Sequence, residues 1–565
     1  MNQENASWYK TAVFLELNVR AFKDTNRDGW GDLNGVTSKL DYIRDLGVDV
    51  IWLQPIFPSP LKDDGYDVSD YTSIFPAYGT VEDFQQLIGA AHARGVKIMV
   101  EIIPNHTSDQ HPWFQASHDP SHPEHDKYRD FYVWSDTDQK YQDARIIFLD
   151  TETSNWTFDP VRGQYFWHRF YSSQPDLNYD NEAVQQAVLD VVKFWADRGV
   201  DGLRVDAPPY LFEREGTNSE NLPETHGFLK RMRKFVDDYA PGTLLLSEAN
   251  QWPEDVIEYF GDGDEMHMNF HFPLMPRLFM AIAKGDRTPI EEIMARTPAL
   301  PENCQWGTFL RCHDELTLEM VTPEERQWMW ETYSPDKKQR INLGIRRRLA
   351  PLLDNDINRI LLMHSLLLTM GGSPFLYYGD EIGMGDNIAL FDRNGLRTPM
   401  QWDASVPGAG FSEADPSLFY QPLIDDPVYG YQHVNVASQE SDPHSLLNCV
   451  KHLIAVRKCY PLFGWGDFSW KQFNFGAKNV AAYQRSWQQE RIVVLNNLTG
   501  EEVNGWIPET ADAFEDVLTG EHVLPGDYSL PPYGFVWLKP IGQDRANLPS
   551  GPNAPQPDYL GSDKN

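Results

Sequence analysis

Three carboxylates stand at places along the chain where catalytic chemistry is expected. Arg204 and Asp206 lie two positions apart in the run GLRVDA, so on a strand both side chains point to one face. The guanidinium would hold the carboxylate ionised and oriented, which suits a nucleophile. Glu248 follows the apolar run LLLS, and apolar surroundings can raise the pKa of a carboxyl group and make it a proton donor. Asp314 comes directly after His313 at the end of another apolar run.

Such a set is what a retaining glycosidase needs. One carboxylate attacks the sugar, a second donates and then removes a proton, and a third holds the ring in a distorted form. The attacking and proton-donating groups of these enzymes lie about 5–5.5 Å apart. Each carboxylate alone is better explained as a structural ion pair at a strand end. Three of them at corresponding places favour the catalytic interpretation.

If these side chains are to meet, the fold must bring several strand ends together. Eight short apolar or alternating runs end in polar residues and are followed by helical periodicity, as in residues 80–94 and 182–198. This alternation predicts an α/β fold, a parallel (β/α)8 TIM barrel, whose strands end at one shared mouth. The runs are TAVFLELNVRAF, VDVIWLQPI, VKIMVEIIPNH, VDGLRVDA, TLLLSEANQ, EMHMNFHF, WGTFLRCHDE and SPFLYYGDE.

The alternation breaks in two places. Residues 107–175 are dense in His, Pro, Asp and aromatic side chains, which predicts a small domain inserted after the third strand. The catalytic barrel would then comprise 1–106 and 176–460. Alternating runs within 461–541 predict a C-terminal antiparallel β-sandwich domain. Residues 542–565 are rich in Pro, Gly and Asn and are expected to be disordered.

The composition disfavours several kinds of partner. A net charge of -35 argues against nucleic acid and anionic membranes, because like charges repel, and favours a neutral small molecule. The four cysteines form no CxxC pair, the N-terminus has no apolar signal segment, and the run ILLMHSLLLTM is too short to span a membrane. We therefore expect a soluble cytoplasmic protein. Its oligomeric state is left open, and a homo-oligomer is one of the alternatives.

Taken together, the motifs resemble the ordered set of the α-amylase superfamily, glycoside hydrolase family 13. They are EIIPNH, QPDLN, GLRVDA, SEAN, CHDE and FLYYGDE. The resemblance implies that Asp206 is the nucleophile, Glu248 the acid/base and Asp314 the transition-state stabiliser. It also implies a set of sugar-binding side chains, namely Asp63, Tyr66, His106, Phe170, Gln174, Arg204, His313 and Arg397.

Two positions depart from the family pattern. Glu101 stands where the family usually has Asp, which adds a methylene at a buried position and is expected to shift a neighbouring contact. Cys312 stands where the family usually has Asn before the His-Asp pair, which removes a hydrogen-bonding amide. Neither residue is one of the three catalytic carboxylates, so we expect activity to be kept.

Within the family, four segments resemble the branch that converts maltose to trehalose: YLFEREGTNSENLPETH, TSDQHPWFQ, SNWTFDP and SEANQWPEDV. Such an isomerase cleaves an α-1,4 bond, keeps the released glucose, and rejoins it through its anomeric hydroxyl, with minor hydrolysis to glucose. The polar loop from Arg214 to His226 is expected to roof the pocket and, with Asn250, to bind the free glucose while excluding solvent. The alternative is that this loop only packs against the inserted domain.

Calcium is the cofactor we expect, in a structural role, and no organic cofactor. The loop DTNRDGWGD has oxygen ligands at alternating positions, which Ca²⁺ prefers, although Gly35 stands where an EF-hand has glutamate. A solvated turn rich in Asp and Asn is the alternative. The family resemblance implies a second site. The ligands of the first site would be Asp24, Asn26, Asp28, the Trp30 carbonyl and Asp32. The ligands of the second site would be Asn105, Asp176, the carbonyls of Tyr210 and Leu211, and Glu213.

Several rival functions remain open. An α-glucosidase that hydrolyses maltose or isomaltose would use the same three carboxylates in a more open pocket. A polymer-forming glucosyltransferase and a sucrose isomerase are further alternatives. A chain that only binds sugar would have lost the carboxylates, so the intact set disfavours it.

Overall fold

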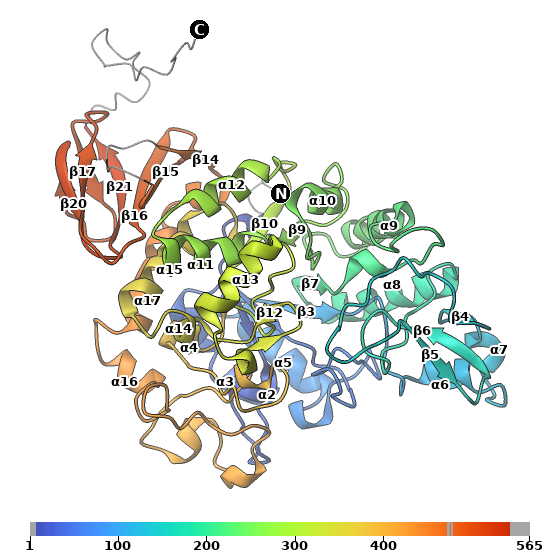
Figure 1. Cartoon of the computed structure of the whole chain (residues 1–565). Helices are drawn as coiled ribbons and strands as arrows, with labels where there is room; N and C mark the ends of the chain where they lie inside the picture. Colours follow the sequence, from blue (N-terminus) through green and yellow to red (C-terminus); the bar gives the residue numbers. More distant parts are fainter. Residues whose placement is uncertain (1–6, 472–474, 476–477, 543–565) are drawn as a thin grey trace, which may run out of the picture.

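The computed structural model describes residues 7–471, 475 and 478–542, and a closed barrel of eight parallel strands lies at its centre (Figure 1). All eight strands predicted from the sequence are present, so the predicted barrel is confirmed. In the order in which they pair, the strands are β1 (Phe14–Leu17), β13 (Ser373–Tyr377), β10 (Gln305–Phe309), β9 (Met268–Phe270), β8 (Leu244–Ser247), β7 (Gly202–Val205), β3 (Lys97–Ile102) and β2 (Val50–Leu53).

Helices cover the outside of the barrel, because each presents an apolar face to strands that are apolar on both sides. α5 (Val81–His92) begins at a capping box formed by Thr80 and Asp83 and buries Phe84 and Leu87. The others in the barrel and its loops are α2 (Val19–Phe22), α3 (Leu33–Ser38), α4 (Leu40–Leu46), α8 (Glu182–Ala196), α9 (Pro223–Tyr239), α10 (Pro253–Val256), α11 (Leu274–Lys284), α12 (Thr288–Arg296), α13 (Pro323–Tyr333), α14 (Leu349–Leu352), α15 (Ile357–Thr369), α16 (Val436–Glu440), α17 (Leu446–Lys458) and α18 (Leu462–Trp465).

The first part of the long connection between β3 and β7, which precedes α8, folds as a separate small unit beside the barrel, here called the inserted unit. It contains α6 (Pro112–His118), α7 (His125–Tyr128) and an antiparallel sheet. The sheet order is β4 (Trp134–Ser135), β6 (Gln164–Trp167) and β5 (Trp156–Asp159). An isolated bridge between His106 and Asp176 joins the two ends of this unit. The exact domain limits given by the sequence stay a prediction.

The C-terminal region forms two antiparallel sheets, which confirms the predicted antiparallel domain. The larger sheet has the order β14 (Asp467–Trp470), β15 (Val480–Trp487), β16 (Glu490–Asn497), β21 (Phe535–Ile541), β18 (Ala513–Asp516) and β19 (His522–Val523), and the smaller pairs β17 (Val503–Ile507) with β20 (Gly526–Leu530). Arg485 of β15 donates to the carbonyls of Thr369 and Met370, where α15 ends, and so ties this region to the barrel. The tail predicted to be disordered lies, from residue 543 onward, outside the described residues.

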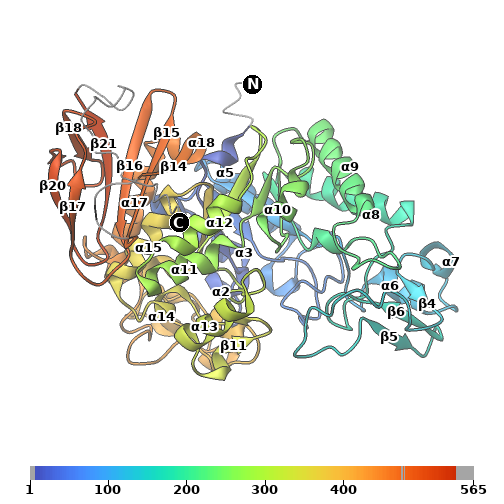
Figure 2. The ribbon, with the colours of Figure 1, turned by 45° about the horizontal axis from the view of Figure 1, so that its top comes forward.

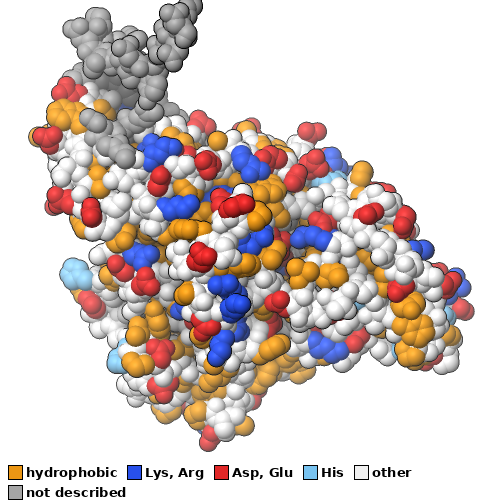
Figure 3. Space-filling model, viewed as in Figure 1, with side chains coloured by type: hydrophobic (Ala, Val, Ile, Leu, Met, Phe, Trp, Pro, Cys, Tyr) orange, Lys and Arg blue, Asp and Glu red, His pale blue; other side chains and the backbone are white. Residues whose placement is uncertain are grey.

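The β4–β6 unit and the C-terminal sheets lie on opposite sides of the barrel (Figures 1 and 2). A short hairpin of β11 (Arg340–Ile341) and β12 (Gly344–Ile345) follows α13. On the face in Figure 3, acidic and basic side chains are interspersed rather than gathered over one element. In the part of the chain that the structure describes, no helix is long and apolar enough to cross a membrane.

Candidate active site

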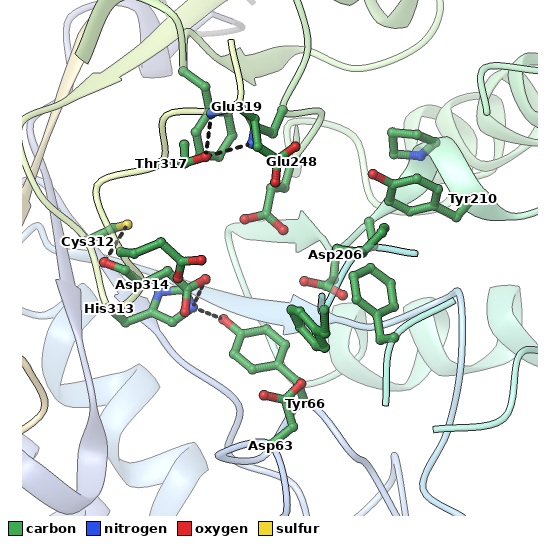
Figure 4. A pocket seen from close by; sticks show the side chains of 18 of the residues that line it. Asp63, Tyr66, Asp206, Tyr210, Glu248, Cys312, His313, Asp314, Thr317 and Glu319 are labelled. Carbon is green, nitrogen blue, oxygen red and sulfur yellow. Dashed lines mark hydrogen bonds and ion pairs between the residues drawn. The ribbon is translucent and has the colours of Figure 1, made fainter. Parts of the chain in front are cut away.

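A cavity of about 150 Å³ opens where the barrel strands end at their carboxyl sides (Figure 4). The structure brings most of the predicted site residues together there. Gln174, Arg204 and Arg397 lie behind the wall, and each donates a hydrogen bond to a carboxylate in it. The predicted residues that line the cavity are Asp63, Tyr66, His106, Phe170, Asp206, Tyr210, Glu248, Asn250, His313 and Asp314.

Arg204, on β7, connects the carboxylates at the floor of the cavity. Its Nη1 donates to Asp206 Oδ1 at 2.6 Å and to Glu101 Oε2 at 2.9 Å. Its Nη2 lies 2.6 Å from Glu248 Oε1. Because both nitrogens belong to one planar guanidinium group, the carboxyl groups of Asp206 and Glu248 lie close to each other. Figure 4 shows both directed into the same space.

Glu248 follows β8 directly and has the environment of a proton donor. Burial raises the pKa of Glu248 to about 8, the Arg204 guanidinium opposes this rise, and the negative charges of Asp206 and Asp314 add to it. At neutral pH the group therefore carries a proton. A general acid works best when its pKa lies close to the working pH.

Asp314 is surrounded by cations. Arg397 Nη2 and Arg393 Nε approach its Oδ1 at 2.9 and 3.1 Å, and His313 Nε2 lies 3.2 Å from its Oδ2. Burial alone would raise the pKa of Asp314, but His313, Arg393 and Arg397 outweigh it and hold this pKa well below the usual range. His313 also contacts the buried Glu16 of β1, and the two carboxylates overcome burial and raise its pKa to about 10. His313 and Asp314 are therefore both ionised at neutral pH.

Tyr66 joins the two sides of the floor. Its hydroxyl donates to Glu101 at 3.1 Å and lies 3.0 Å from His313 Nε2, and its ring stacks on the His313 ring. Glu101, the first departure from the family pattern, also accepts a bond from Trp52 Nε1 at 2.8 Å. Burial raises the pKa of Glu101 to about 7, against the effect of Arg204. The longer side chain thus keeps three partners beneath the cavity.

Polar atoms at the edge of the cavity are left for a ligand. Asp63 accepts a bond from Gln174 at 2.8 Å, and burial raises its pKa to about 7 although Arg393 opposes the rise. His106 Nε2 and Asn250 Oδ1 are buried and have no hydrogen-bond partner in the protein. Buried polar atoms are rarely left unsatisfied, so these two are placed to bind hydroxyl groups.

A further part of the cavity wall, formed by Tyr210 and Glu319 and here called the roof, is held by Arg145, which lies between β4 and β5. Its Nη1 lies 3.1 Å from Glu319 Oε2, its Nη2 donates to the Tyr210 hydroxyl at 3.1 Å, and its Nε donates to Glu220 at 2.9 Å. Tyr210 and Glu319 both line the cavity. The side chain therefore connects the inserted unit with loops after β7 and β10.

Comparison with known proteins decides the family. Residues 17–466 match the alpha amylase catalytic domain. The chain belongs to the α-amylase family. It is 54% identical to the trehalose synthase/amylase of Mycolicibacterium smegmatis, over 95% of this chain and 93% of that one. It is 52% identical to the trehalose synthase of a Pimelobacter species, over 97% and 98%. Among solved structures, the trehalulose synthase of Pseudomonas mesoacidophila has a TM-score of 0.75, with 27% identity over 94% and 99%.

In this α-amylase family chain, no residue of the loop from Arg214 to His226 lines the cavity, in contrast to its predicted place as a roof that touches sugar. Arg214 pairs with Asp180 at 2.8 Å, and Glu220 pairs with Arg145 and with Arg169. The loop is rich in acidic side chains, and the inserted unit supplies arginines, so these meet and the loop packs against the unit. It supports the roof through Arg145.

The second predicted metal site has unsatisfied ligand atoms. Asn105 Oδ1, Asp176 Oδ2 and Glu213 Oε1 are all buried without a hydrogen-bond partner. Burial raises the pKa of Asp176 to about 8, and burial together with the charge of Asp176 raises the pKa of Glu213 well above its usual range. Two carboxyl groups and an amide oxygen with these properties fit a cation such as Ca²⁺. The other two predicted ligands are the carbonyls of Tyr210 and Leu211, which closely precede Glu213 in the sequence. Leu211 is buried, and the side chain of Tyr210 lines the cavity.

The first predicted metal loop satisfies its own carboxylates. Asp24 accepts bonds from the backbone amides of Asn26 and Gly29, and Asp28 accepts one from Trp30. Asp32 caps α3. These contacts are those of a turn rich in Asp and Asn, so the loop lacks the orphaned oxygens seen at the second site. Over the described residues, no group of three or more His, Cys, Asp or Glu side chains is arranged to hold a metal ion.

Sequence reasoning missed several residues of the cavity. Arg393 touches Asp314 and lies four positions before the predicted Arg397, a signal that could have included it. Cys312 was named only as a departure from the family, yet it lines the cavity, and burial raises the pKa of its thiol well above the usual range. The other lining residues that were missed are Ile147, Phe148, Ala207, Pro209, Phe272, Glu315, Thr317 and Glu319.

Proposed function

We propose that this chain is an intramolecular glucosyltransferase that interconverts maltose and trehalose through a covalent glucosyl-enzyme, with minor hydrolysis to glucose. The observation that carries the proposal is one cavity in which Asp206, Glu248 and Asp314 meet beneath a roof held by Arg145. The relatives named trehalose synthase, which align with nearly the whole chain, support the choice of substrate.

In the first step Asp206 acts as nucleophile. One of its carboxylate oxygens bonds to the anomeric carbon of the non-reducing glucose, and the bond from that carbon to the glycosidic oxygen breaks. Glu248 gives its proton to the departing oxygen, which its raised pKa allows at neutral pH. The products are a glucosyl ester on Asp206 and a free glucose that stays in the cavity.

Asp314 and its neighbours assist while positive charge develops on the sugar. Asp314 is ionised, because three cations surround it, and its oxygens are placed to accept bonds from sugar hydroxyls. His106 Nε2 and Asn250 Oδ1 supply further polar atoms without a protein partner. Phe170, 5.2 Å from the His106 ring between centroids, gives an apolar wall for the ring.

In the second step the retained glucose returns. After it turns, its anomeric hydroxyl oxygen attacks the anomeric carbon of the ester, Glu248 takes the hydroxyl proton, and the bond to Asp206 breaks. Two inversions keep the α configuration, so the product is trehalose. Water that enters first takes the place of the hydroxyl and gives glucose. The roof contacts of Arg145 limit that entry.

Product analysis from maltose tests the proposal. We expect trehalose to dominate, glucose to be minor, and trehalose to be converted back to maltose. Asp206→Ala is expected to give neither product while its melting temperature stays close to that of the wild type. Glucose as the sole product would identify an α-glucosidase instead, and no turnover of either disaccharide would overturn an enzymatic function.

A structural calcium ion belongs to the same proposal. Asn105, Asp176 and Glu213 are the side chains that would hold it, beside the bridge between His106 and Asp176 that joins the inserted unit to the barrel. The ion would supply positive charge that neutralises two buried carboxylates, and no chemical step passes through it. Its removal is tested below.

The working compartment we propose is the cytoplasm. Cys304, Cys312, Cys449 and Cys459 are all free thiols in the structure, and free thiols are typical of reducing compartments. Fractionation of cells that make the protein would test this, since a periplasmic or secreted location would contradict it.

A further inference from the structure

A row of buried charges runs from the end of β1 to the cavity. Arg20, in α2, pairs with the carboxylate of Asp64, which lies in the loop after β2. The other oxygen of Asp64 accepts a bond from Arg397 Nη1 at 2.5 Å. Arg397 Nη2 then donates to Asp314 Oδ1 at 2.9 Å. Neither Arg20 nor Asp64 lines the cavity.

These charges are shielded from water, so each guanidinium depends on an opposite charge nearby. The side chains of Arg20, Asp64 and Arg397 are at most 7% exposed. A buried guanidinium is costly unless a carboxylate compensates it, and Asp64 compensates two of them at once. The ring of Tyr420 covers Arg20, whose guanidinium lies 4.9 Å from the ring centre, and the Tyr420 hydroxyl donates to the Arg397 carbonyl.

The backbone at Asp64 is adapted to this place. Its φ is +54°, in the left-handed region that few residues other than Gly, Asn and Asp adopt readily. The turn directs Asp64 away from the cavity while its neighbour Asp63 lines the cavity. Two adjacent carboxylates therefore have different duties, one toward the ligand and one toward Arg397.

Arg397 is the cation whose position depends on this row. Its remaining contact is a bond from Nε to the His313 carbonyl at 3.1 Å. Arg393, the other guanidinium on Asp314, is held separately by Glu315 at 2.7 Å. Loss of the Asp64 charge would free one side of Arg397 and let it shift on Asp314.

We propose that Asp64 and Arg20 are positioning residues, which fix Arg397 and through it the carboxylate of Asp314 that faces the sugar. The inference rests on the proposed function only in its first step, glucosyl transfer to Asp206. It does not depend on whether glucose or trehalose is the product.

The test uses the purified full chain with 4-nitrophenyl α-D-glucoside, which reports formation of the glucosyl-enzyme, and with maltose. We expect Asp64→Asn to lower kcat on both substrates about 10- to 100-fold, because a small misplacement of a catalytic group has effects of that size. KM should change much less. Arg20→Met should lower kcat by a smaller factor. Glu413→Gln is the matched control, since it breaks the exposed pair with Arg27 and should leave kcat unchanged.

The pH profile separates positioning from a purely structural role. Asp64→Asn removes a negative charge, which favours the ionised form of the remaining carboxyl groups and so lowers their pKa values. The alkaline limb of kcat/KM should therefore shift to lower pH. Arg20→Met removes a positive charge and should shift it to higher pH. In the double variant the loss in kcat should equal that of Asp64→Asn alone, because Arg20 acts through Asp64.

Lower melting temperatures with kcat and pH profile unchanged would overturn the inference, as would losses in kcat that add in full. If Asp64→Asn does not fold, Arg20→Met keeps the test open, because Asp64 then retains Arg397. A wild type that cleaves the nitrophenyl substrate but forms no trehalose would contradict the proposed isomerase and leave this inference to be judged by the variants.

Discussion

The floor and the roof of the cavity are built differently. The floor consists of Asp206 and Glu248 directly after β7 and β8, with Asp314 after β10, and Arg204, 1% exposed, joins the first two. The roof depends on Arg145, from a connection without regular secondary structure, whose side chain is 40% exposed. Groups on rigid strand ends keep their geometry, whereas groups on loops can move.

The difference suggests that the floor and the roof have separate functions. Buried ion pairs with several hydrogen bonds are hard to break, so the floor would keep the geometry that the proposed bond cleavage needs. Partly exposed pairs contribute little free energy, typically about 0–1 kcal/mol each, so the roof can open to exchange substrate and product. The floor would then decide whether the bond breaks, and the roof what the glucosyl-enzyme reacts with. Four experiments test this comparison.

The largest effect is expected at the floor, from Glu248→Gln. Loss of the proton donor should lower kcat with maltose by about 10²–10⁴-fold, the usual contribution of general acid–base catalysis. The first step with 4-nitrophenyl α-D-glucoside should suffer less, because that leaving group departs without protonation. Steady-state and burst kinetics measure both. Equal losses on the two substrates would contradict the role of Glu248 as the acid.

The pH dependence follows from the same residue. The raised pKa of Glu248 keeps its proton on up to a pH of about 8. Above that pH the acid is lost, so kcat/KM should fall about tenfold per pH unit, since one deprotonation removes activity. Initial rates from pH 6 to 10 measure the limb. This alkaline fall in kcat/KM should be absent in Glu248→Gln. If the fall persists in that variant, it is caused by deprotonation of a group other than Glu248.

A change in product rather than rate is expected at the roof. Arg145→Met removes the contacts to Glu319, Tyr210 and Glu220. Water should then reach the glucosyl-enzyme more often, so the ratio of glucose to trehalose should rise several-fold while consumption of maltose changes by only a few-fold. Arg129→Met is the control, because Arg129 pairs with Asp130 on the surface of the same inserted unit. An unchanged product ratio would show that the roof does not exclude water.

The smallest effect is expected at the join between inserted unit and barrel. A chelator should lower the melting temperature of the wild type by a few degrees, because an ion that binds only the folded chain stabilises it. Glu213→Gln should remove that response, whereas Asp28→Asn, in the loop that satisfies its own carboxylates, should keep it. Differential scanning calorimetry with and without Ca²⁺ measures it. If the effect of the chelator on the melting temperature were lost only in Asp28→Asn, the ion would be assigned to the loop that contains Asp28 instead.

The sequence by itself determined the barrel and the floor. Apolar runs must be buried, and a polar residue that ends such a run lies at the rim of the barrel, so Asp206 and Glu248 could be placed from pattern alone. The antiparallel C-terminal region follows from the same local rules. Periodicity is a local property, and it predicted what depends on local burial.

Only the tertiary structure decided which distant side chains meet. Arg145 on Glu319, Arg20 on Asp64, and Asp176 beside Glu213 each join segments whose approach depends on how long loops pack. The loop from Arg214 to His226 shows the same limit, because its polar composition suits either a sugar or the arginines of the inserted unit. Composition fixes which bonds a loop can make, and the packing of the barrel fixes which of them it does make.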